Sequence, residues 1–360
     1  MDRIRVIRDY VDRAVKNINT FWHEIPLDFI TPADRVLSDG YGNSADRAVV
    51  IHAMLSEAGF KPEFVLASWV SPIEELKKPL YEYPAPHWFS GVLVRVRSED
   101  GHIYLNDTDQ YAIVGTTRSA GHPCLVLRSG TFETIEPLSD RHADRRDTDI
   151  SIRLSEDGDI VLTQKRTFYG ENYAAFRKQF SEMLPEERKR HHEQLISSIS
   201  QAAKPLGDYV TRYDQYPGTE ELSVQIDSYA VRQDGYLYLK VPGLINILEG
   251  VTSDKRENPL YQSGPRNARI IVDVLLPDGI KACELLPPDG FRVWMGSGGG
   301  ISMETSVTEA GNGRKYDVVR IVQDVDIDPV IVPPSHYPDL LDSQRVISHP
   351  SSNLILMRMR

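Results

Sequence analysis

Hydrophobic residues in the first third of the chain recur at two different spacings. One set lies on a single face of a predicted helix: Ile4, Ile7, Val11, Ala14, Val15 and Ile18. The segment 49–58 is apolar on nearly all sides, which predicts a buried central helix that ends at Gly59. Apolar runs at 64–67, 92–96 and 103–105 predict strands. Helices and strands in this order predict an α+β domain.

A charged run at 139–147 separates this part from the rest of the chain. It lacks apolar periodicity, so we expect a solvated linker between domains at 1–142 and 143–360. Beyond it, alternating positions and turn residues predict an antiparallel β-sandwich, with an inserted helical pair at about 172–204. The expected strands are 150–154, 158–162, 164–169, 222–231, 236–241, 268–275, 291–295, 302–308 and 315–325.

A short polar motif precedes the predicted central helix: Tyr41-Gly42-Asn43-Ser44-Ala45-Asp46-Arg47-Ala48. Asn43 with Asp46 three residues later places an acceptor and a carboxylate near the free amides of a first helical turn. The simplest interpretation is therefore a capped core helix. The same residues resemble the nucleophile motif of bacterial transglutaminase-like proteins, in which tyrosine, glycine, aspartate and cysteine precede any residue, aspartate, lysine or arginine, and alanine. Ser44 stands at the cysteine position.

This family has a papain-like core. The resemblance of the sequence to the family implies the positions of the other catalytic residues. The family's cysteine lies at a helix N-terminus, where the dipole favours the thiolate and a histidine accepts its proton. The histidine opens an apolar strand, and an aspartate ends the following strand. When these two family motifs are aligned with residues 89–96 and 103–108, Gly91 falls at the histidine position and Asn106 at the aspartate position. The resemblance thus implies a triad in which all three residues are replaced.

Replacement of nucleophile, base and orienting group together predicts an inactive, degenerate site. Loss of one triad member alone lowers rates by on the order of 10⁴ to 10⁶ in comparable hydrolases. The alternative is an acyl-transfer or amide-hydrolysing enzyme that uses Ser44 with His87 and Asp107. His87 lies roughly 13 Å from Gly91 in an extended chain at about 3.3 Å per residue, and Asp107 would face away from Asn106 in a regular strand.

Aromatic residues and prolines are frequent between Ser68 and Trp88. In active relatives the equivalent loop borders the substrate groove, so the resemblance implies a remnant cleft in this region. Its candidate residues are Tyr41, Asn43, Trp69, His87, Trp88 and Asp107. Such a cleft is suited to a peptide, a protein or a glycan, and we expect a binding or scaffold role. Aromatic packing at a sheet edge or a domain interface stays open as the alternative.

Composition and short motifs limit the classes of partner and cofactor that the protein is expected to bind. The 360-residue chain has a net charge of −11, which argues against nucleic acid and anionic membranes. No stretch approaches the about 20 apolar residues of a membrane span. His191-His192-Glu193 does not make a zincin motif, because Ile196 occupies the second histidine position. We expect no metal and no cofactor. Cys124 is a weak candidate nucleophile because an apolar strand follows it.

The resemblance continues into the second part of the chain. Phrases similar to 276–279 and 334–340 occur in family members, which carry a β domain with an inserted helical pair. Members also begin with a further β-sandwich, often after a secretion signal. Neither opens this sequence, since no apolar signal core follows Met1. The resemblance therefore implies a periplasmic or extracellular location without a signal peptide to support it.

Overall fold

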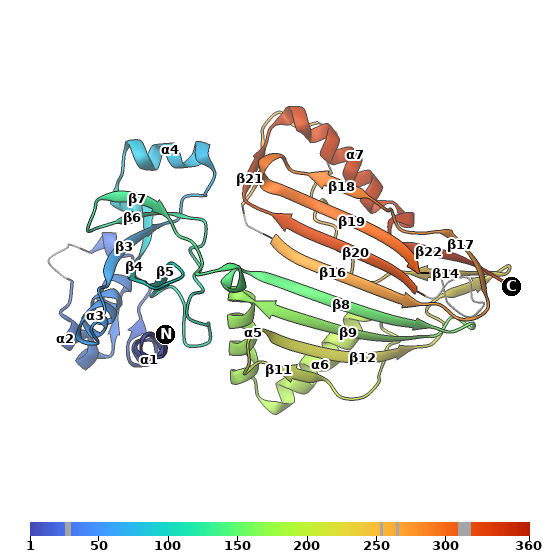
Figure 1. The fold of residues 1–360 in the computed structure, drawn as a ribbon, viewed down its shortest axis with the longest axis horizontal. Helices are drawn as coiled ribbons and strands as arrows, with labels where there is room; N and C mark the ends of the chain where they lie inside the picture. The colour runs from blue at the N-terminus through green and yellow to red at the C-terminus, as the bar shows by residue number, and fades with distance from the viewer. Residues whose placement is uncertain (26–29, 253–254, 264–265, 309–317) are drawn as a thin grey trace. The chain divides into compact units, whose positions relative to one another are not determined.

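A computed structural model of the chain describes residues 1–25, 30–252, 255–263, 266–308 and 318–360 (Figure 1). The chain divides into two compact units. The first comprises Met1–Asp144 with Tyr169–Gln179, and the second comprises Arg145–Phe168 with Phe180–Arg360. Helices and sheets occur together, so the expected α+β class is confirmed. The contacts divide the region expected as a helical pair at 172–204, because its first residues belong with the first unit.

The helices of the first unit have one buried member at their centre. The helices are α1 (Asp2–Ala14), α2 (Ala33–Asp39), α3 (Ser44–Glu57), α4 (Glu74–Glu82) and the first part of α5 (Gly170–Glu182). Single 3₁₀ turns lie at Trp22–Glu24, Pro86–Trp88 and Asp140–His142. Helix α3 is the central helix expected from its apolar composition, with Ile51 and Leu55 almost fully buried. It packs against Ile7 and Val11 of α1 in one hydrophobic cluster.

A five-stranded antiparallel sheet completes the first unit, in the order β5-β4-β3-β6-β7 among the described residues. The strands are β3 (Glu63–Ser68), β4 (Phe89–Arg97), β5 (His102–Leu105), β6 (Pro123–Val126) and β7 (Thr131–Thr134). The pair β1 (Lys16–Asn17) and β2 (Tyr41–Gly42) is parallel. Val94 and Leu105 share the cluster of α1 and α3, whereas Leu93 and Tyr104 lie in another cluster. Both faces of the sheet are therefore buried.

The segment 68–88 contains helix α4, although its aromatic residues and prolines were expected to form a loop. Two glutamates, Glu74 and Glu75, lie in the first helical turn, where they interact favourably with the helix dipole. Pro79 lies inside the helix, and its carbonyl accepts a bond from the Tyr83 amide at 3.0 Å. Leu80 is fully buried and attaches the helix to the core. Packing therefore outweighs the helix-breaking tendency of proline here.

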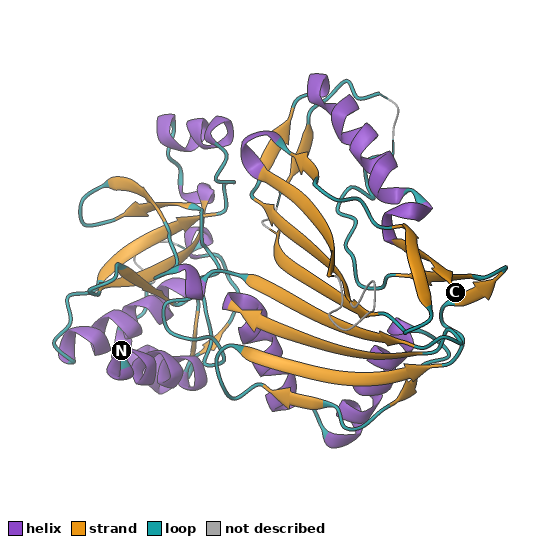
Figure 2. Cartoon of the chain, turned by 45° about the vertical axis from the view of Figure 1, so that its right-hand side comes forward, coloured by secondary structure: helices purple, strands orange, loops and turns teal. Residues whose placement is uncertain are grey.

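The second unit consists mainly of strands (Figure 2). Its large sheet has nine strands among the described residues, in the order β10-β12-β9-β8-β16-β20-β19-β18, with β11 beside β12. Their bounds are β8 (Arg145–Leu154), β9 (Ile160–Tyr169), β10 (Lys204–Pro205), β11 (Val210–Arg212), β12 (Gly218–Ile226), β16 (Arg266–Leu275), β18 (Phe291–Trp294), β19 (Gly299–Thr308) and β20 (Val318–Ile327). The pairing is antiparallel except between β8 and β16, which are parallel.

Two strand predictions in this sheet need comment. The strands expected separately at 158–162 and 164–169 form the single strand β9. Thr163 continues the alternation between them, and its hydroxyl bonds to Ser223 on β12 at 2.8 Å. The strand expected at 315–325 begins at Val318 as β20, and its residues 315–317 lie outside the described residues.

The large sheet is covered on one face by a smaller sheet and by helices. The smaller sheet contains β13 (Val231–Gln233), β14 (Tyr236–Lys240), β22 (Leu354–Met359) and β17 (Ile280–Leu285). One cluster joins both sheets, with Ile150 and Val272 from the large sheet and Leu239 and Met357 from the small one. Other elements are α6 (Pro185–Ile199), α7 (Tyr337–Ser348), β15 (Leu260–Gln262), β21 (Val330–Val332) and 3₁₀ turns at Gly296–Gly298, Pro334–His336 and Pro350–Asn353. Helix α7 packs over β18, β19 and β20 in a further cluster.

Candidate functional site

The polar motif caps helix α3. Asn43 is the N-cap, and its Oδ1 accepts bonds from the amides of Ala45 at 2.8 Å and Asp46 at 3.0 Å. The Asp46 carboxylate accepts a bond from the Asn43 amide at 3.1 Å, which completes a capping box. Its other oxygen accepts from the Thr31 amide at 2.9 Å. The cap expected from the sequence is therefore present, and Asn43 is a buried structural residue rather than part of an open surface.

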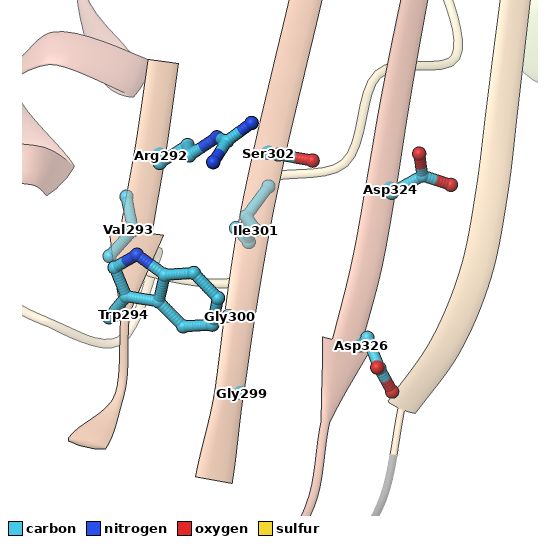
Figure 3. Close-up of a pocket in the computed structure, with 9 residues that line it drawn as sticks. All are labelled: Arg292, Val293, Trp294, Gly299, Gly300, Ile301, Ser302, Asp324 and Asp326. Atoms are coloured by element: carbon cyan, nitrogen blue, oxygen red, sulfur yellow. The ribbon is translucent and has the colours of Figure 1, made fainter. Parts of the chain in front are cut away.

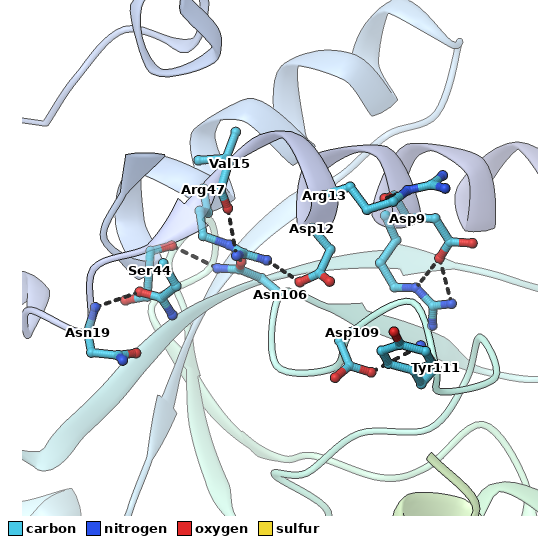
Figure 4. A network of polar contacts seen from close by, with 12 residues as sticks. Asp9, Asp12, Arg13, Val15, Asn19, Ser44, Arg47, Asn106, Asp109 and Tyr111 are labelled. Atoms are coloured by element: carbon cyan, nitrogen blue, oxygen red, sulfur yellow. Dashed lines mark hydrogen bonds and ion pairs between the residues drawn. The ribbon is translucent and has the colours of Figure 1, made fainter. Parts of the chain in front are cut away.

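Arg47 extends from the first turns of α3 and is buried (Figure 4). Its guanidinium donates to the Val15 carbonyl and to Asp12 Oδ1, both at 2.9 Å, and to Asn106 Oδ1 at 3.3 Å. It therefore joins α1, α3 and the residue after β5. The motif indicated that Arg47 matters, but nothing in the sequence pointed to Asp12, because an aspartate on an otherwise amphipathic helix is expected to face water.

Asn106 lies at the centre of this corner of the first unit (Figure 4). Its Nδ2 donates to the carbonyls of Ser44 and Val92, each at 2.7 Å, while its Oδ1 accepts from Arg47. The backbone of Asn106 has a φ of 89°, in the left-handed region that asparagine tolerates better than most residues. Residues 44, 92 and 106 are thus brought into contact, although they are far apart in the sequence. We refer to Ser44, Arg47, Gly91 and Asn106 as the triad corner.

The triad corner contains no paired nucleophile and base. Gly91 lies opposite Ala67 in the β3–β4 pairing, and a Cβ built on it would meet nothing within 4 Å. The Ser44 hydroxyl makes no hydrogen bond with any other described residue; only its carbonyl is engaged there. Nucleophilic catalysis by serine requires a base within hydrogen-bond reach of the hydroxyl. The described residues do not supply one.

The alternative group of Ser44, His87 and Asp107 is not assembled in the described residues. The Asp107 carboxylate accepts bonds from the Thr117 hydroxyl and from the main-chain amides of Arg118 and Ser119. Burial raises the pKa of this carboxyl above its ordinary value, while these bonds act in the opposite direction. Asp107 therefore fixes the 117–119 loop. The exposed His87 makes its described contacts elsewhere.

Cys124 cannot take the place of the missing nucleophile. Its side chain is fully buried in the sheet cluster that includes Leu93 and Tyr104. Burial raises the pKa of the Cys124 thiol to about 11. The reactive thiolate is thus disfavoured at neutral pH.

Trp69, His87 and Trp88 form one cluster, which we call the aromatic group; Trp69 and His87 are exposed, and Trp88 is half-buried. The ring centroids of Trp69 and Trp88 lie 5.5 Å apart, and those of His87 and Trp88 lie 4.8 Å apart. Both indole N–H groups donate to main-chain carbonyls, Trp69 to His87 at 2.8 Å and Trp88 to Tyr83 at 3.2 Å. Trp69 is still 55% exposed. These bonds fix the rings while leaving ring surface open.

The candidate cleft residues therefore occupy different environments. Trp69, His87 and Trp88 lie together at the ends of β3 and β4, whereas Asn43 caps α3 and Asp107 holds a loop. Tyr41 is exposed on β2, opposite Lys16 of β1. No described contact joins Tyr41 to the aromatic group.

Neither a metal centre nor a spanning helix occurs in the described part of the chain. Its His, Cys, Asp and Glu side chains form no group of three or more that could hold a metal ion. None of its helices is long and apolar enough to cross a membrane.

Comparison with known proteins finds a solved structure with a similar fold. No protein-family model matches the chain, and no curated protein matches it. Among solved structures, it is similar to a putative protease from Parabacteroides distasonis ATCC 8503, with 14% identity and a TM-score of 0.50. The match covers 99% of this chain and 52% of that protein, so the chain spans about half of its length. At this identity the likeness shows a protease-like fold alone, and the transglutaminase-like family and papain-like core stay predictions.

Proposed function

We propose that the first unit is a transglutaminase-like module with a papain-like core that has lost catalysis and binds an extended peptide segment of a protein. The observation that carries this proposal is the hydrogen bonding of the Asn106 side chain. Both of its amide hydrogens are directed to main-chain carbonyls, those of Ser44 and Val92, and its oxygen accepts from Arg47.

The argument against catalysis rests on what an orienting group has to do. In a triad this group accepts a hydrogen bond from the base and so fixes the base's tautomer and direction. Asn106 instead fastens the first residue of α3 to strand β4, and Gly91 has no side chain that could act as a base. The corner is thus suited to stabilising the fold.

The aromatic group supports binding. Its indole N–H groups are already bonded within the loop, so a ligand would meet the faces and edges of the indoles, and the His87 imidazole is the polar group left among the three rings. These rings contact one another and main-chain carbonyls, and Trp88 also packs against the core of the first unit. Such a surface favours proline, aliphatic and aromatic side chains over a sugar, whose hydroxyls need polar partners. Tyr83, whose main-chain carbonyl accepts the Trp88 indole N–H, is itself 76% exposed.

Catalysis is tested by measuring transamidation of casein with a fluorescent amine and hydrolysis of casein. We expect rates equal to the blank for the native protein and for Ser44→Ala. The matched control is Ser56→Ala, because Ser56 lies exposed at the other end of α3 and bonds to the His52 carbonyl. Turnover that disappears in Ser44→Ala but persists in Ser56→Ala would overturn the proposal in favour of a serine-dependent enzyme.

Binding is tested with a display library of extended decapeptides selected against the whole chain. We expect enriched peptides rich in proline and aromatic residues, and a loss of affinity of about tenfold or more for Trp69→Ala, equivalent to about 1.4 kcal/mol. Trp294→Ala in the second unit is the control and should bind normally. Failure to enrich any peptide, or equal affinity for Trp69→Ala and the native protein, would refute the binding role.

A further inference from the structure

Trp294 is the most exposed of the four tryptophans, with 67% of its surface accessible to solvent. It ends β18, the last strand in the described order of the large sheet. Side chains alternate between the two faces of a strand, and Val293 is buried in the cluster beneath helix α7. Arg292 and Trp294 therefore lie on the opposite face, away from that core.

Two rows of residues cross three strands at this position. The pairing places Trp294 opposite Gly300 and Gly300 opposite Asp326, and it places Arg292 opposite Ser302 and Ser302 opposite Asp324. Neighbouring strands lie about 4.8 Å apart, so each row spans only about 10 Å.

These rows line a recess on the open face of the sheet (Figure 3). Figure 3 shows the indole of Trp294 lying over Gly300 and the guanidinium of Arg292 beside Ser302, with the carboxylates of Asp324 and Asp326 on the next strand. The recess has a volume of about 170 Å³. Pockets for drug-sized ligands are larger, at about 300–1,000 Å³, so this one is suited to a small ring.

Glycine creates the floor of the recess. Gly299 has a φ of 77°, and a Cβ on it would lie 2.1 Å from the Asp326 carbonyl oxygen. A Cβ on Gly300 would lie 1.8 Å from the Val293 carbonyl oxygen. The close backbone approach therefore excludes side chains at both positions. Covering such a glycine is a structural use for an aromatic ring, but this indole leaves most of its surface in solvent.

The charges of the recess nearly cancel. Asp324 lies 3.7 Å from the guanidinium of Arg269, and Arg292 supplies a second positive charge near the carboxylates. Two guanidinium groups disfavour a cationic ligand, and two carboxylates disfavour an anionic one. An apolar side chain would leave these polar groups without partners. A neutral ligand with many hydroxyls and an apolar face avoids each of these penalties.

We propose that this recess, formed by Arg292, Trp294, Ser302, Asp324 and Asp326 around a glycine floor, is a binding subsite for a neutral carbohydrate. The indole stacks on the C–H face of one sugar ring. The carboxylates accept bonds from sugar hydroxyls, while the guanidinium and the serine hydroxyl donate to them. The side chains of Arg292 and Ser302 and the indole N–H make no hydrogen bond within the described part of the chain, so they are available without disrupting the fold. This subsite is independent of the peptide site proposed for the first unit.

The experiment is calorimetric titration of the whole chain with cellohexaose, xylohexaose, mannohexaose and chitohexaose. We expect at least one of these neutral sugars to bind. Trp294→Ala should lower the affinity for that sugar about tenfold or more, which is about 1.4 kcal/mol. Asp326→Asn removes a charge with little change in size and should lower the affinity for the sugar by a smaller factor. Trp69→Ala is the control and should bind the sugar normally.

The outcomes separate the two binding proposals. Absence of binding by all four sugars, or sugar affinity unchanged in Trp294→Ala, overturns the carbohydrate subsite. If only Trp69→Ala loses sugar binding, the sugar binds to the first unit, and the carbohydrate subsite at Trp294 is again overturned. Binding of peptides in place of sugars by this face would identify strand addition at the edge of β18. Thermal melting of each variant shows that the folded protein is being compared, and Asp326→Asn still tests the subsite if Trp294→Ala fails to fold.

Discussion

The triad corner and the Trp294 recess both gather polar side chains from neighbouring elements, but they use them in opposite ways. In the triad corner, Arg47 and Asn106 bond to main-chain carbonyls and to each other. In the recess, the side chains of Arg292 and Ser302 make no hydrogen bond within the described residues, and Trp294 is largely exposed. A polar cluster that resembles an active site by sequence can thus be structural, while an unremarkable strand carries available chemistry.

This difference has a direct energetic consequence. Removing a buried group leaves its partners without hydrogen bonds, and each unsatisfied buried partner costs about 1–3 kcal/mol. Removing an exposed, unbonded group changes stability little. Substitutions of Arg47 and Asn106 should therefore affect unfolding, whereas substitutions in the recess should affect binding.

The largest effect is expected for Arg47→Met. This change removes the partner of Asp12, an ion pair in which both side chains are at most 17% exposed, together with the bond to the Val15 carbonyl. We expect a loss of about 3 kcal/mol in the free energy of unfolding, measured by urea titration with circular dichroism. Arg5→Met is the control, because its pair with Asp2 is exposed and should contribute less than about 0.5 kcal/mol. Equal effects at both positions would contradict the structural role of Arg47.

Asn106→Asp should have the next largest effect, a loss of about 2 kcal/mol at neutral pH. The carboxylate cannot donate to the carbonyls of Ser44 and Val92, and it faces both of them with negative charge. The Arg47 guanidinium favours the charged form of the new carboxyl, whereas burial against two carbonyls disfavours it. We expect burial and the carbonyls to dominate and to raise the folded-state pKa, so the destabilisation grows as pH rises through the unfolded pKa and shrinks in acid. Urea titrations at pH 4 and pH 7 test the sign. Asn246→Asp, at an exposed surface bond to Ser348, should show neither effect.

An intermediate effect is expected at alkaline pH from the sheet of the first unit. Burial raises the pKa of Cys124 to about 11 from 9.0, and that of Tyr104 to about 12 from 10.0. Both groups are neutral when protonated, so their stabilising contribution is complete below the unfolded pKa and is lost as pH rises through the folded one. Between pH 8 and pH 10 the thiol alone should lower the free energy of unfolding by about 1 kcal/mol.

Urea titrations of the native protein and of Cys124→Ala measure this contribution. The variant should lose less stability than the native protein over the same pH interval, whatever its stability at pH 8. An identical pH dependence for both proteins would show that the thiol does not titrate as its burial requires.

The smallest effects are expected for Ser44→Ala and Trp294→Ala. The Ser44 hydroxyl makes no hydrogen bond with the described residues, and the Trp294 side chain is mostly in solvent. Each variant should unfold within about 0.5 kcal/mol of the native protein. A loss of more than about 2 kcal/mol in Trp294→Ala would assign the indole to covering Gly300, and the comparison between the two regions would fail.

The sequence by itself determined the elements whose signals are local. The cap of α3 follows from Asn43 and Asp46, and the central helix follows from a continuous apolar segment, because both depend on residues within a few positions of each other. Alternating apolar positions likewise identified most strands of the second unit. The resemblance of the motif selected positions 44, 91 and 106 but could not say what their atoms contact.

Only the tertiary structure decided those contacts. Asn106 bonds to a residue 62 positions away, β8 pairs with β16 in parallel across more than one hundred residues, and α4 forms despite Pro79 because Leu80 is buried. The row from Trp294 through Gly300 to Asp326 exists only through strand pairing. The physical reason is common to all of them: local propensity is weak, and long-range packing and hydrogen bonding determine which side chains are satisfied within the fold and which stay open to a ligand.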